Sequence, residues 1–117
     1  MPRYVALIYG EDGDWSDAQY REQLAEYATF GQNAEKVITT GAALQPTSTA
    51  TTVRVKGGKG GDVVTSDGPF AETKEVLGGF YMFDCADLDE ALNWAAQIPG
   101  AWSGSIEVRP VLEFGEG

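Results

Sequence analysis

The sequence predicts an α+β fold in which two helices cover one face of an antiparallel sheet. Short apolar runs that are typical of strands, such as 4–9, are interspersed along the chain with two segments of helical spacing, 16–38 and 87–98. A glycine-rich turn at 57–61 separates two further strand-like runs, which indicates a hairpin and therefore antiparallel pairing. The chain has 117 residues, a length that fits one domain spanning residues 1–117.

The N-terminal third is predicted to form a strand and then a long helix. Residues 4–9, YVALIY, are a continuous apolar run too short for a helix, which indicates a strand covered on both faces. Ser16 and Gln19 have the spacing of a capping box at a helix start. The following residues lie on one stripe at steps of four and three: Tyr20, Leu24, Tyr27, Gly31, Ala34 and Ile38. Gly41 is expected to end this helix in a left-handed conformation.

The middle of the chain is predicted to contain strands. Residues 49–65 are interpreted as two strands joined at the glycine-rich turn, and Val53 and Val55 alternate with Arg54 as in a half-buried strand. LGGFYMFD, residues 77–84, is predicted to be another strand, in which the two glycines permit a bulge or a close backbone approach.

The C-terminal part is predicted to contain a short helix and a last strand. Asp87 and Glu90 have the spacing of an acidic helix cap, and Pro99 with Gly100 is expected to end that helix. The next run, SIEVRPVLEF, alternates. Its apolar face is expected to consist of Ile106, Val108, Leu112 and Phe114. Pro110 within the run favours an edge or bulge position.

The predicted order of strand, helix, strands, strand, helix and strand is the ferredoxin-like arrangement. Residues 4–9 and 80–83 carry large apolar side chains on both faces of their strands, more than one covered face requires. An exposed apolar sheet face of that size usually marks an interface. We therefore expect a homodimer in which two copies pack sheet to sheet.

Composition excludes several classes of partner. Eighteen acidic and eight basic residues give a net charge of -10, which repels phosphate backbones, so no nucleic-acid partner is expected. No apolar run approaches the roughly 20 residues of a membrane span, and the first apolar run is too short for a signal peptide. The single cysteine, Cys85, fits a reducing compartment, so a cytoplasmic protein with no membrane partner is expected.

The chain contains no histidine. This excludes Ser-His-Asp triads, Cys-His dyads and histidine-ligated metals within the chain, and one cysteine cannot make a thiolate zinc site. The glycine cluster at 57–61 lacks the spacing and the following helix of a phosphate loop, and the loop at 12–17 lacks the glycine of a calcium loop. No metal and no cofactor are expected, and any chemistry would use carboxylates, Lys, Arg, Tyr or backbone groups.

The stretch SDGPFAETKE, residues 66–75, contains most of the candidate site residues. Asp67, Gly68 and Pro69 are explained as a turn, with Phe70 anchoring it in the core. The charged cluster that follows has two interpretations. It is a solvated edge or a Lys–Glu pair, or it is the lip of a polar pocket. In the second interpretation Asp67 or Glu72 acts as acid or base and Lys74 or Arg109 holds an anion.

Nearly the whole chain resembles the DGPF subgroup of the YCII-related proteins. The matching segments are YVALIYG, ALQPTSTATTVRV, DGPFAETKEVLGGFYMFD and DLDEALNWAAQIPGAWSGSIEVRPV. The resemblance implies a ferredoxin-like subunit that dimerises into an α+β barrel with a cleft near the sheet interface. YCII-like relatives carry a His-Asp pair proposed to be catalytic. Here the histidine would fall near Tyr27 and the aspartate near 97–101, so histidine chemistry is not inherited.

The resemblance also implies a regulatory circuit, because DGPF proteins are commonly encoded beside extracytoplasmic-function sigma factors. Two hypotheses remain open from the sequence. The first is a homodimeric small-molecule-binding or accessory protein with a sigma-factor-related partner. The second is a small enzyme that acts on an anionic or carbonyl metabolite, with Asp67, Glu72 and Tyr27 as catalytic candidates. Its ligand-binding candidates are Lys74, Arg109, Asp67 and Glu72.

Overall fold

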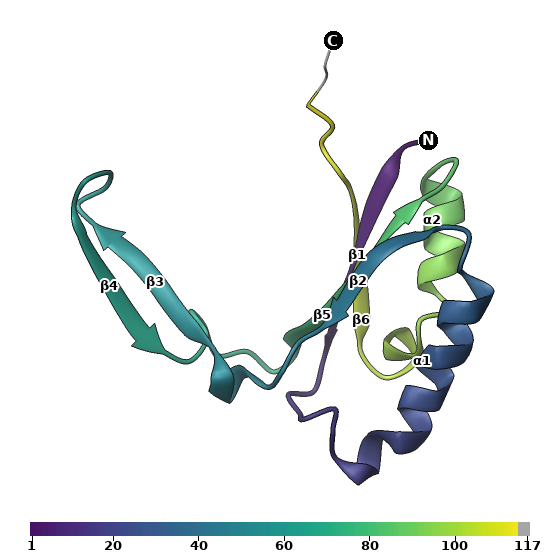
Figure 1. Ribbon diagram of the computed structural model, residues 1–117, viewed down its shortest axis with the longest axis horizontal. Helices are drawn as coiled ribbons and strands as arrows, with labels where there is room; N and C mark the ends of the chain where they lie inside the picture. Colours follow the sequence, from purple (N-terminus) through teal and green to yellow (C-terminus); the bar gives the residue numbers. More distant parts are fainter. Residues whose placement is uncertain (115–117) are drawn as a thin grey trace.

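The computed structural model describes residues 1–114 and shows a helix-covered sheet from which a separate hairpin projects (Figure 1). The four strands of the main sheet are β1 (Arg3–Gly10), β2 (Ile38–Ala43), β5 (Val76–Asp84) and β6 (Ser105–Pro110). They lie in the order β2-β5-β1-β6, and every neighbouring pair is antiparallel. The hairpin consists of β3 (Thr51–Lys56) and β4 (Asp62–Asp67).

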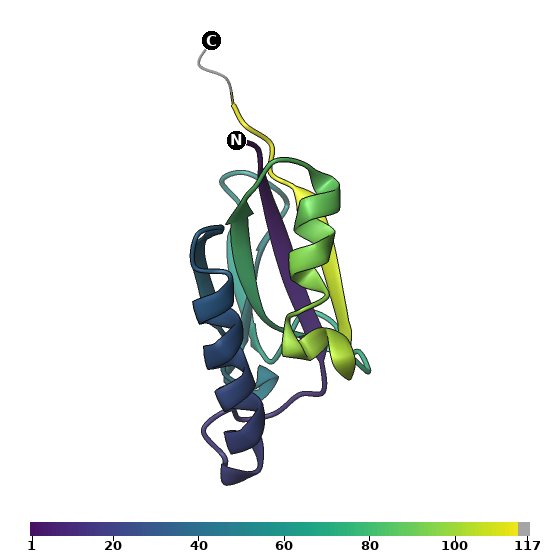
Figure 2. The same cartoon turned by 90° about the vertical axis from the view of Figure 1, so that its right-hand side faces the viewer.

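Two α-helices, α1 (Arg21–Asn33) and α2 (Leu88–Ala95), lie on the same face of the main sheet (Figure 2). Short 3-10 turns occur at Ala18–Tyr20, Thr47–Thr49 and Pro99–Trp102. The predicted α+β class with antiparallel strands and two helices is confirmed. Among the described residues no helix is both long and apolar enough to cross a membrane.

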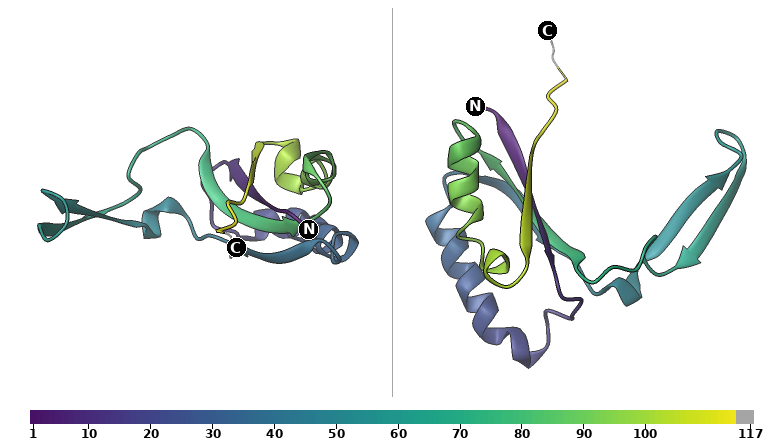
Figure 3. Two further views of the ribbon diagram at one scale, coloured as in Figure 1. Left: turned by 90° about the horizontal axis from the view of Figure 1, so that it is seen from above. Right: turned by 180° about the vertical axis from the view of Figure 1, so that it is seen from behind.

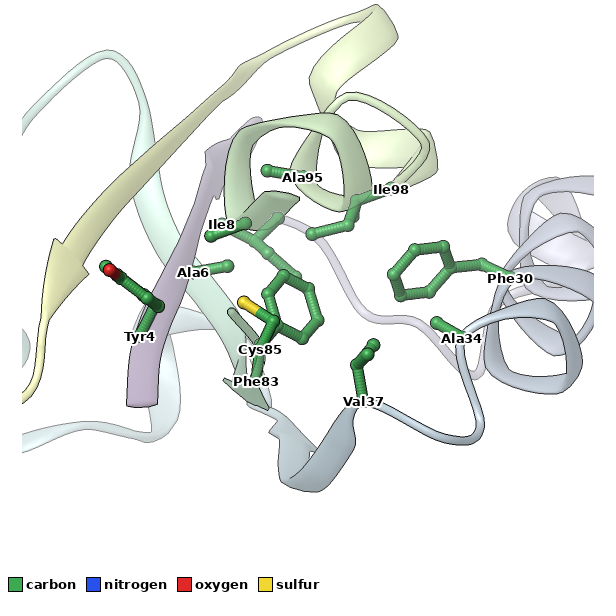
Figure 4. Packing of buried hydrophobic residues seen from close by; sticks show 11 residues of the cluster. Tyr4, Ala6, Ile8, Phe30, Ala34, Val37, Phe83, Cys85, Ala95 and Ile98 are labelled. Atoms are coloured by element: carbon green, nitrogen blue, oxygen red, sulfur yellow. The ribbon is translucent and has the colours of Figure 1, made fainter. Parts of the chain in front are cut away.

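The core lies between the main sheet and the two helices (Figure 4). In β1 the alternation of side chains directs Tyr4, Ala6 and Ile8 to the helices, and all three are buried. The other buried residues of this core are Phe30, Ala34, Val37, Phe83, Cys85, Ala91, Ala95 and Ile98. Small side chains from α2 therefore allow that helix to pack closely on the sheet.

Among residues 1–114 no helix lies on the opposite face of the main sheet (Figure 2), and the centre of that face is apolar. Val5 pairs with Met82 and Leu7 pairs with Phe80, so these four side chains share the face that points away from the helices. All four are only partly buried in the single chain. The strand at 4–9 is thus apolar on both sides, as predicted, but one subunit covers only one of them.

The glycine pair in β5 has the predicted effect. The pairing of β1 with β5 shifts register between Ile8 and Tyr9, opposite Gly79 and Leu77, which is a bulge. A Cβ atom on Gly79 would lie 2.7 Å from the carbonyl oxygen of Ala42. The backbones of β2 and β5 can therefore approach only because this residue has no side chain.

The prediction for the first helix was wrong at both ends. Ser16 does not cap it, because the Ser16 amide and hydroxyl donate to Asp14 Oδ1 at 2.9 and 2.6 Å. The helix ends at Asn33, and the following residues 38–43 form β2 instead. Gly41 lies inside that strand, where a Cβ would be 2.8 Å from the Tyr81 ring. The absence of a side chain at Gly41 allows the Tyr81 ring to pack closely on β2. Gly41 does not end a helix in a left-handed conformation.

The second helix begins with the predicted acidic cap. Asp87 Oδ1 accepts from the Glu90 amide at 2.9 Å, and Glu90 Oε1 accepts from the Ala86 amide at 2.7 Å. These reciprocal bonds satisfy two backbone donors near the helix start. After the helix, Ile106 and Val108 pack against the core as predicted.

Three burial predictions do not hold in the single chain. Val53 and Val55 are 60% and 46% exposed rather than half-buried within a larger sheet. Leu112 and Phe114 lie beyond the end of β6 and are exposed. Phe70 does not anchor its turn in the core, because it is 79% exposed.

Candidate functional site

An apolar cleft of about 310 Å³ lies between α1 and the β2–β5 side of the sheet. Its lining residues come from five segments of the chain. They are Ile8, Trp15, Leu24, Tyr27, Gly41, Ala42, Ala43, Gly78, Gly79, Phe80 and Tyr81. The small residues of β2 and the glycines of β5 leave space where larger side chains would fill the groove.

Trp15 lines this cleft and also lines a second hollow of about 190 Å³. The indole packs against Tyr20 at a centroid distance of 5.0 Å and meets Tyr27 edge-on at 5.8 Å and 82°. The second hollow adds polar lining residues, among them Glu11 and Gln23. The two hollows together present aromatic walls with a polar end, an arrangement typical of small-molecule sites.

The loop that carries Trp15 is fixed by carboxylates. Asp12 Oδ1 accepts from the Thr47 amide at 3.0 Å, and Asp12 Oδ2 accepts from the Thr47 hydroxyl. Both bonds lower the pKa of the Asp12 carboxyl, and the bond from the Thr47 hydroxyl has the larger effect. Asp14 makes the bonds to Ser16 described above, and they lower its pKa in the same way. The acidic side chains thus hold the loop that positions the indole. Within residues 1–114 no group of His, Cys, Asp and Glu side chains is arranged to hold a metal.

Tyr27 is the only sequence-predicted candidate that lines the cleft. Its hydroxyl oxygen accepts from the Gly100 amide at 3.1 Å, which leaves the hydroxyl hydrogen free to donate to a ligand. Burial raises the pKa of Tyr27 to about 12, although the Gly100 bond acts in the opposite direction. At neutral pH this phenol is a neutral hydrogen-bond donor and not a base.

Tyr27 predicts a stability change at high pH. Its pKa is about 12 in the folded chain and about 10 when unfolded. The contribution to stability is complete below pH 10 and is lost as pH rises through the folded pKa, because ionisation favours the unfolded state. We expect the free energy of unfolding to fall between about pH 10 and pH 12, and Tyr27→Phe to reduce this fall. Urea unfolding at several pH values measures it, and an identical pH dependence in the variant would contradict the assignment.

The other predicted site residues lie outside the cleft. Asp67 ends β4 and is exposed, and Glu72 and Lys74 lie on the exposed loop between β4 and β5. Arg109 is on the edge strand β6, paired in register with Val5 on the helix-free face, and its Nε lies 4.0 Å from Glu107 Oε2. One subunit does not bring these four side chains to Tyr27. Their catalytic and binding roles stay predictions.

The turn before β5 has the predicted backbone geometry. Gly68 has a φ of 95°, a conformation that favours glycine. Its amide donates to the Ala50 carbonyl at 2.7 Å, which closes the base of the hairpin. Asp67, Gly68 and Pro69 therefore connect the hairpin to the main sheet, as the structural interpretation of this turn requires.

Sequence reasoning missed residues that line the two hollows, above all Trp15 and Gln23. The loop at 12–17 was compared only with a calcium loop, which it does not match. Its signal was the tryptophan itself, since a large aromatic residue in a polar loop needs a surface to pack on.

Comparisons with known proteins agree on the kind of domain. The family model described as YCII-related domain matches residues 2–115. An uncharacterised protein of Rhizobium meliloti (strain 1021) is 49% identical over 121 residues, which cover 97% of this chain and 95% of that protein. The solved structure of 5-chloro-2-hydroxyhydroquinone dehydrochlorinase from Burkholderia phenoliruptrix AC1100, in complex with 2,5-dihydroxybenzoquinone, matches with a TM-score of 0.52. It is 13% identical and the match covers 97% of this chain and 96% of that chain, so the likeness is one of fold.

Proposed function

The chain belongs to the YCII-related domain family, and from that premise we propose that it is a homodimeric small-molecule-binding protein of the DGPF subgroup. The observation that carries the proposal is the cleft walled by Trp15 and Tyr27. Its volume of about 310 Å³ lies at the lower end of the range for small-molecule pockets. The ligand is therefore small, on the scale of one or two rings.

The lining of the cleft favours a planar, uncharged molecule. Trp15 and Tyr27 offer ring edges and faces for stacking, and the walls are largely aromatic or aliphatic. No Lys or Arg is among the described residues that line either hollow, whereas Glu11 lines the second one. An anion would meet this carboxylate and the net charge of -10 without a cation to offset them. The Tyr27 hydroxyl, as a donor, suits a carbonyl oxygen.

The homodimer part of the proposal is supported by the apolar sheet face around Leu7 and Phe80, which a single subunit leaves without a helix. We propose that ferredoxin-like subunits pack through this face into an α+β barrel. The cytoplasmic location and the sigma-factor-related partner belong to the same proposal, and the partner is supported by the family resemblance. Co-purification of the chain with the neighbouring sigma factor at micromolar concentration tests it, and no co-purification would count against it.

A second candidate function is that of a small enzyme. The protein of similar fold is a dehydrochlorinase whose structure holds a quinone, and in this chain a neutral phenol and a carboxylate, Tyr27 and Glu11, line adjoining hollows. Such a pair supplies a proton donor and an acceptor for a carbonyl substrate. Proton NMR of the chain incubated with each ligand that binds separates the two functions, because only an enzyme changes the ligand.

The binding proposal predicts a strong effect of Trp15. Benzamide and benzoate have nearly the same size and differ in charge, so we expect benzamide to perturb the NMR signals of residues that line the cleft and benzoate to bind more weakly. Trp15→Ala should weaken benzamide binding about tenfold, which corresponds to about 1.4 kcal/mol of lost stacking and burial.

The matched control for this substitution is Trp102→Ala. Trp102 is 60% exposed and its indole N–H donates to the Ala96 carbonyl, outside the cleft. Its replacement should leave benzamide binding unchanged. Equal losses in the two variants, or benzoate binding as tightly as benzamide, would refute the proposed ligand class.

A further inference from the structure

The hairpin of β3 and β4, residues 51–67 with its turn, is called the arm below. All of its residues are exposed except Thr52, which is half-buried. The radius of gyration is 16.5 Å, compared with roughly 13 Å for a compact domain of this length. In Figures 1 and 3 the arm projects on the side of the main sheet that is opposite the helices. It therefore points into the space in front of the uncovered apolar face.

An isolated two-stranded hairpin is marginally stable in water, so an arm of this kind needs a surface to pack on. The register pairs Val55 with Val63 and Val53 with Thr65, which places three valines on one face of the arm. We call Val53, Val55 and Val63 the valine face. These side chains are 60%, 46% and 69% exposed, and the arm lies away from the core of its own subunit. The opposite face carries Arg54 and Val64.

The charge of the arm is opposite to that of the rest of the chain. Arg54, Lys56 and Lys59 lie in 54–61, a stretch without an acidic residue. Asp62 and Asp67 are the acidic residues of the arm, so three basic and two acidic residues give it a net charge of +1. The chain as a whole carries -10, which leaves -11 for the other residues. The arm is thus complementary to the acidic body of this same protein.

We propose that the arm packs on a second copy of this chain. The valine face contacts the uncovered sheet face of the partner, and the basic tip lies against the partner's acidic surface. Two-fold symmetry repeats the contact, so each subunit gives one arm and receives one. This inference rests on the proposed homodimer and adds to it the segment that each subunit extends over the other.

Two adjacent substitutions test the inference. Val63→Glu places a charge on the valine face, and Val64→Glu places the same charge on the opposite face of the same strand. Both valines are exposed, at 69% and 44%, so both variants should fold. In sedimentation equilibrium we expect Val63→Glu to raise the dimer Kd at least about tenfold and Val64→Glu to change it less than about threefold. Circular dichroism checks that both variants keep the wild-type secondary structure.

Hydrogen exchange of the wild-type chain gives a second readout. Backbone amides of residues 51–67 should exchange more slowly at concentrations where the chain is dimeric than at concentrations where it is monomeric. If the wild type dimerises but Val63→Glu and Val64→Glu have equal Kd values, the arm inference is overturned. In that case, loss of the dimer on Phe80→Asp still supports the sheet-face homodimer. A wild type that is monomeric at every concentration overturns both.

Discussion

Phe83→Ala is expected to lower the free energy of unfolding by about 3–5 kcal/mol, the range for removing a buried aromatic side chain. Phe83 lies in β5, a central strand of the main sheet, and its side chain is fully buried. Its ring stacks on Tyr81 with an interplanar angle of 12° and a centroid distance of 6.3 Å, and it also lies 6.3 Å from Phe30. Its loss would leave a cavity between the sheet and α1 that the surrounding backbone cannot close. A domain of this size has a stability of roughly 5–15 kcal/mol, so this loss is a large fraction of the total and should lower the urea concentration at the unfolding midpoint.

Urea unfolding at one fixed protein concentration measures this loss. The matched control is Phe114→Ala, since Phe114 is 87% exposed and lies beyond the end of β6. We expect the control to change the free energy of unfolding by less than about 0.5 kcal/mol. Equal losses in the two variants would mean that the core is not centred on β5.

The elements that were predicted correctly are those whose sequence pattern is local and strong. The run at 4–9 became β1, the glycine pair in 77–84 became a bulge, and Asp87 with Glu90 became a helix cap. In each case neighbouring residues contain the physical cause, which is apolar continuity, absence of a side chain or reciprocal hydrogen bonding.

The strand β2 could not be predicted because its pattern is weak and its cause is distant. ITTGAA contains small residues and one glycine, and the helical stripe of the preceding segment continues as far as Ile38. Residue 41 must be glycine because the ring of Tyr81, forty residues further along the chain, occupies the space of a side chain there. The predicted fold class is correct, but the prediction counted the hairpin at 51–67 among the strands of the main sheet. In the structure this hairpin forms a sheet of its own.

The candidate site was predictable only in part for a related reason. Tyr27 was identified through the family resemblance, and the structure places it on the cleft. The acidic and basic residues of 67–75 were chosen as site candidates because they are adjacent in sequence. A cleft is lined by residues that are close in space, and these need not be adjacent in sequence. Trp15 reaches the cleft because Asp12 binds Thr47, a contact between residues 35 positions apart that no local pattern predicts.

Adjacent aromatic residues in β5 predict opposite outcomes on substitution by aspartate. Phe80 pairs with Leu7 and Ala42 on the uncovered sheet face, whereas the Tyr81 ring points to the helices and lies 5.1 Å from Phe30. Phe80→Asp should therefore dissociate the proposed dimer, with a rise in Kd of at least about 30-fold, or about 2 kcal/mol. The subunit should keep its fold, because the new carboxylate faces water in the monomer.

Tyr81→Asp is the matched counterpart, since it places the same carboxylate on the core side of the same strand. A charge there has no partner among the core side chains, so we expect the fold to be lost along with the dimer. Sedimentation equilibrium and urea unfolding on both variants separate the two effects. If Phe80→Asp unfolds the subunit as fully as Tyr81→Asp, or if the wild-type chain remains a 12.5 kDa species at millimolar concentration, the sheet face is not an interface. If Phe80→Asp is instead folded and monomeric, the subunit does not need Phe80 for its own stability. The apolar side chains on this side of β1 and β5 then serve contact with a second copy.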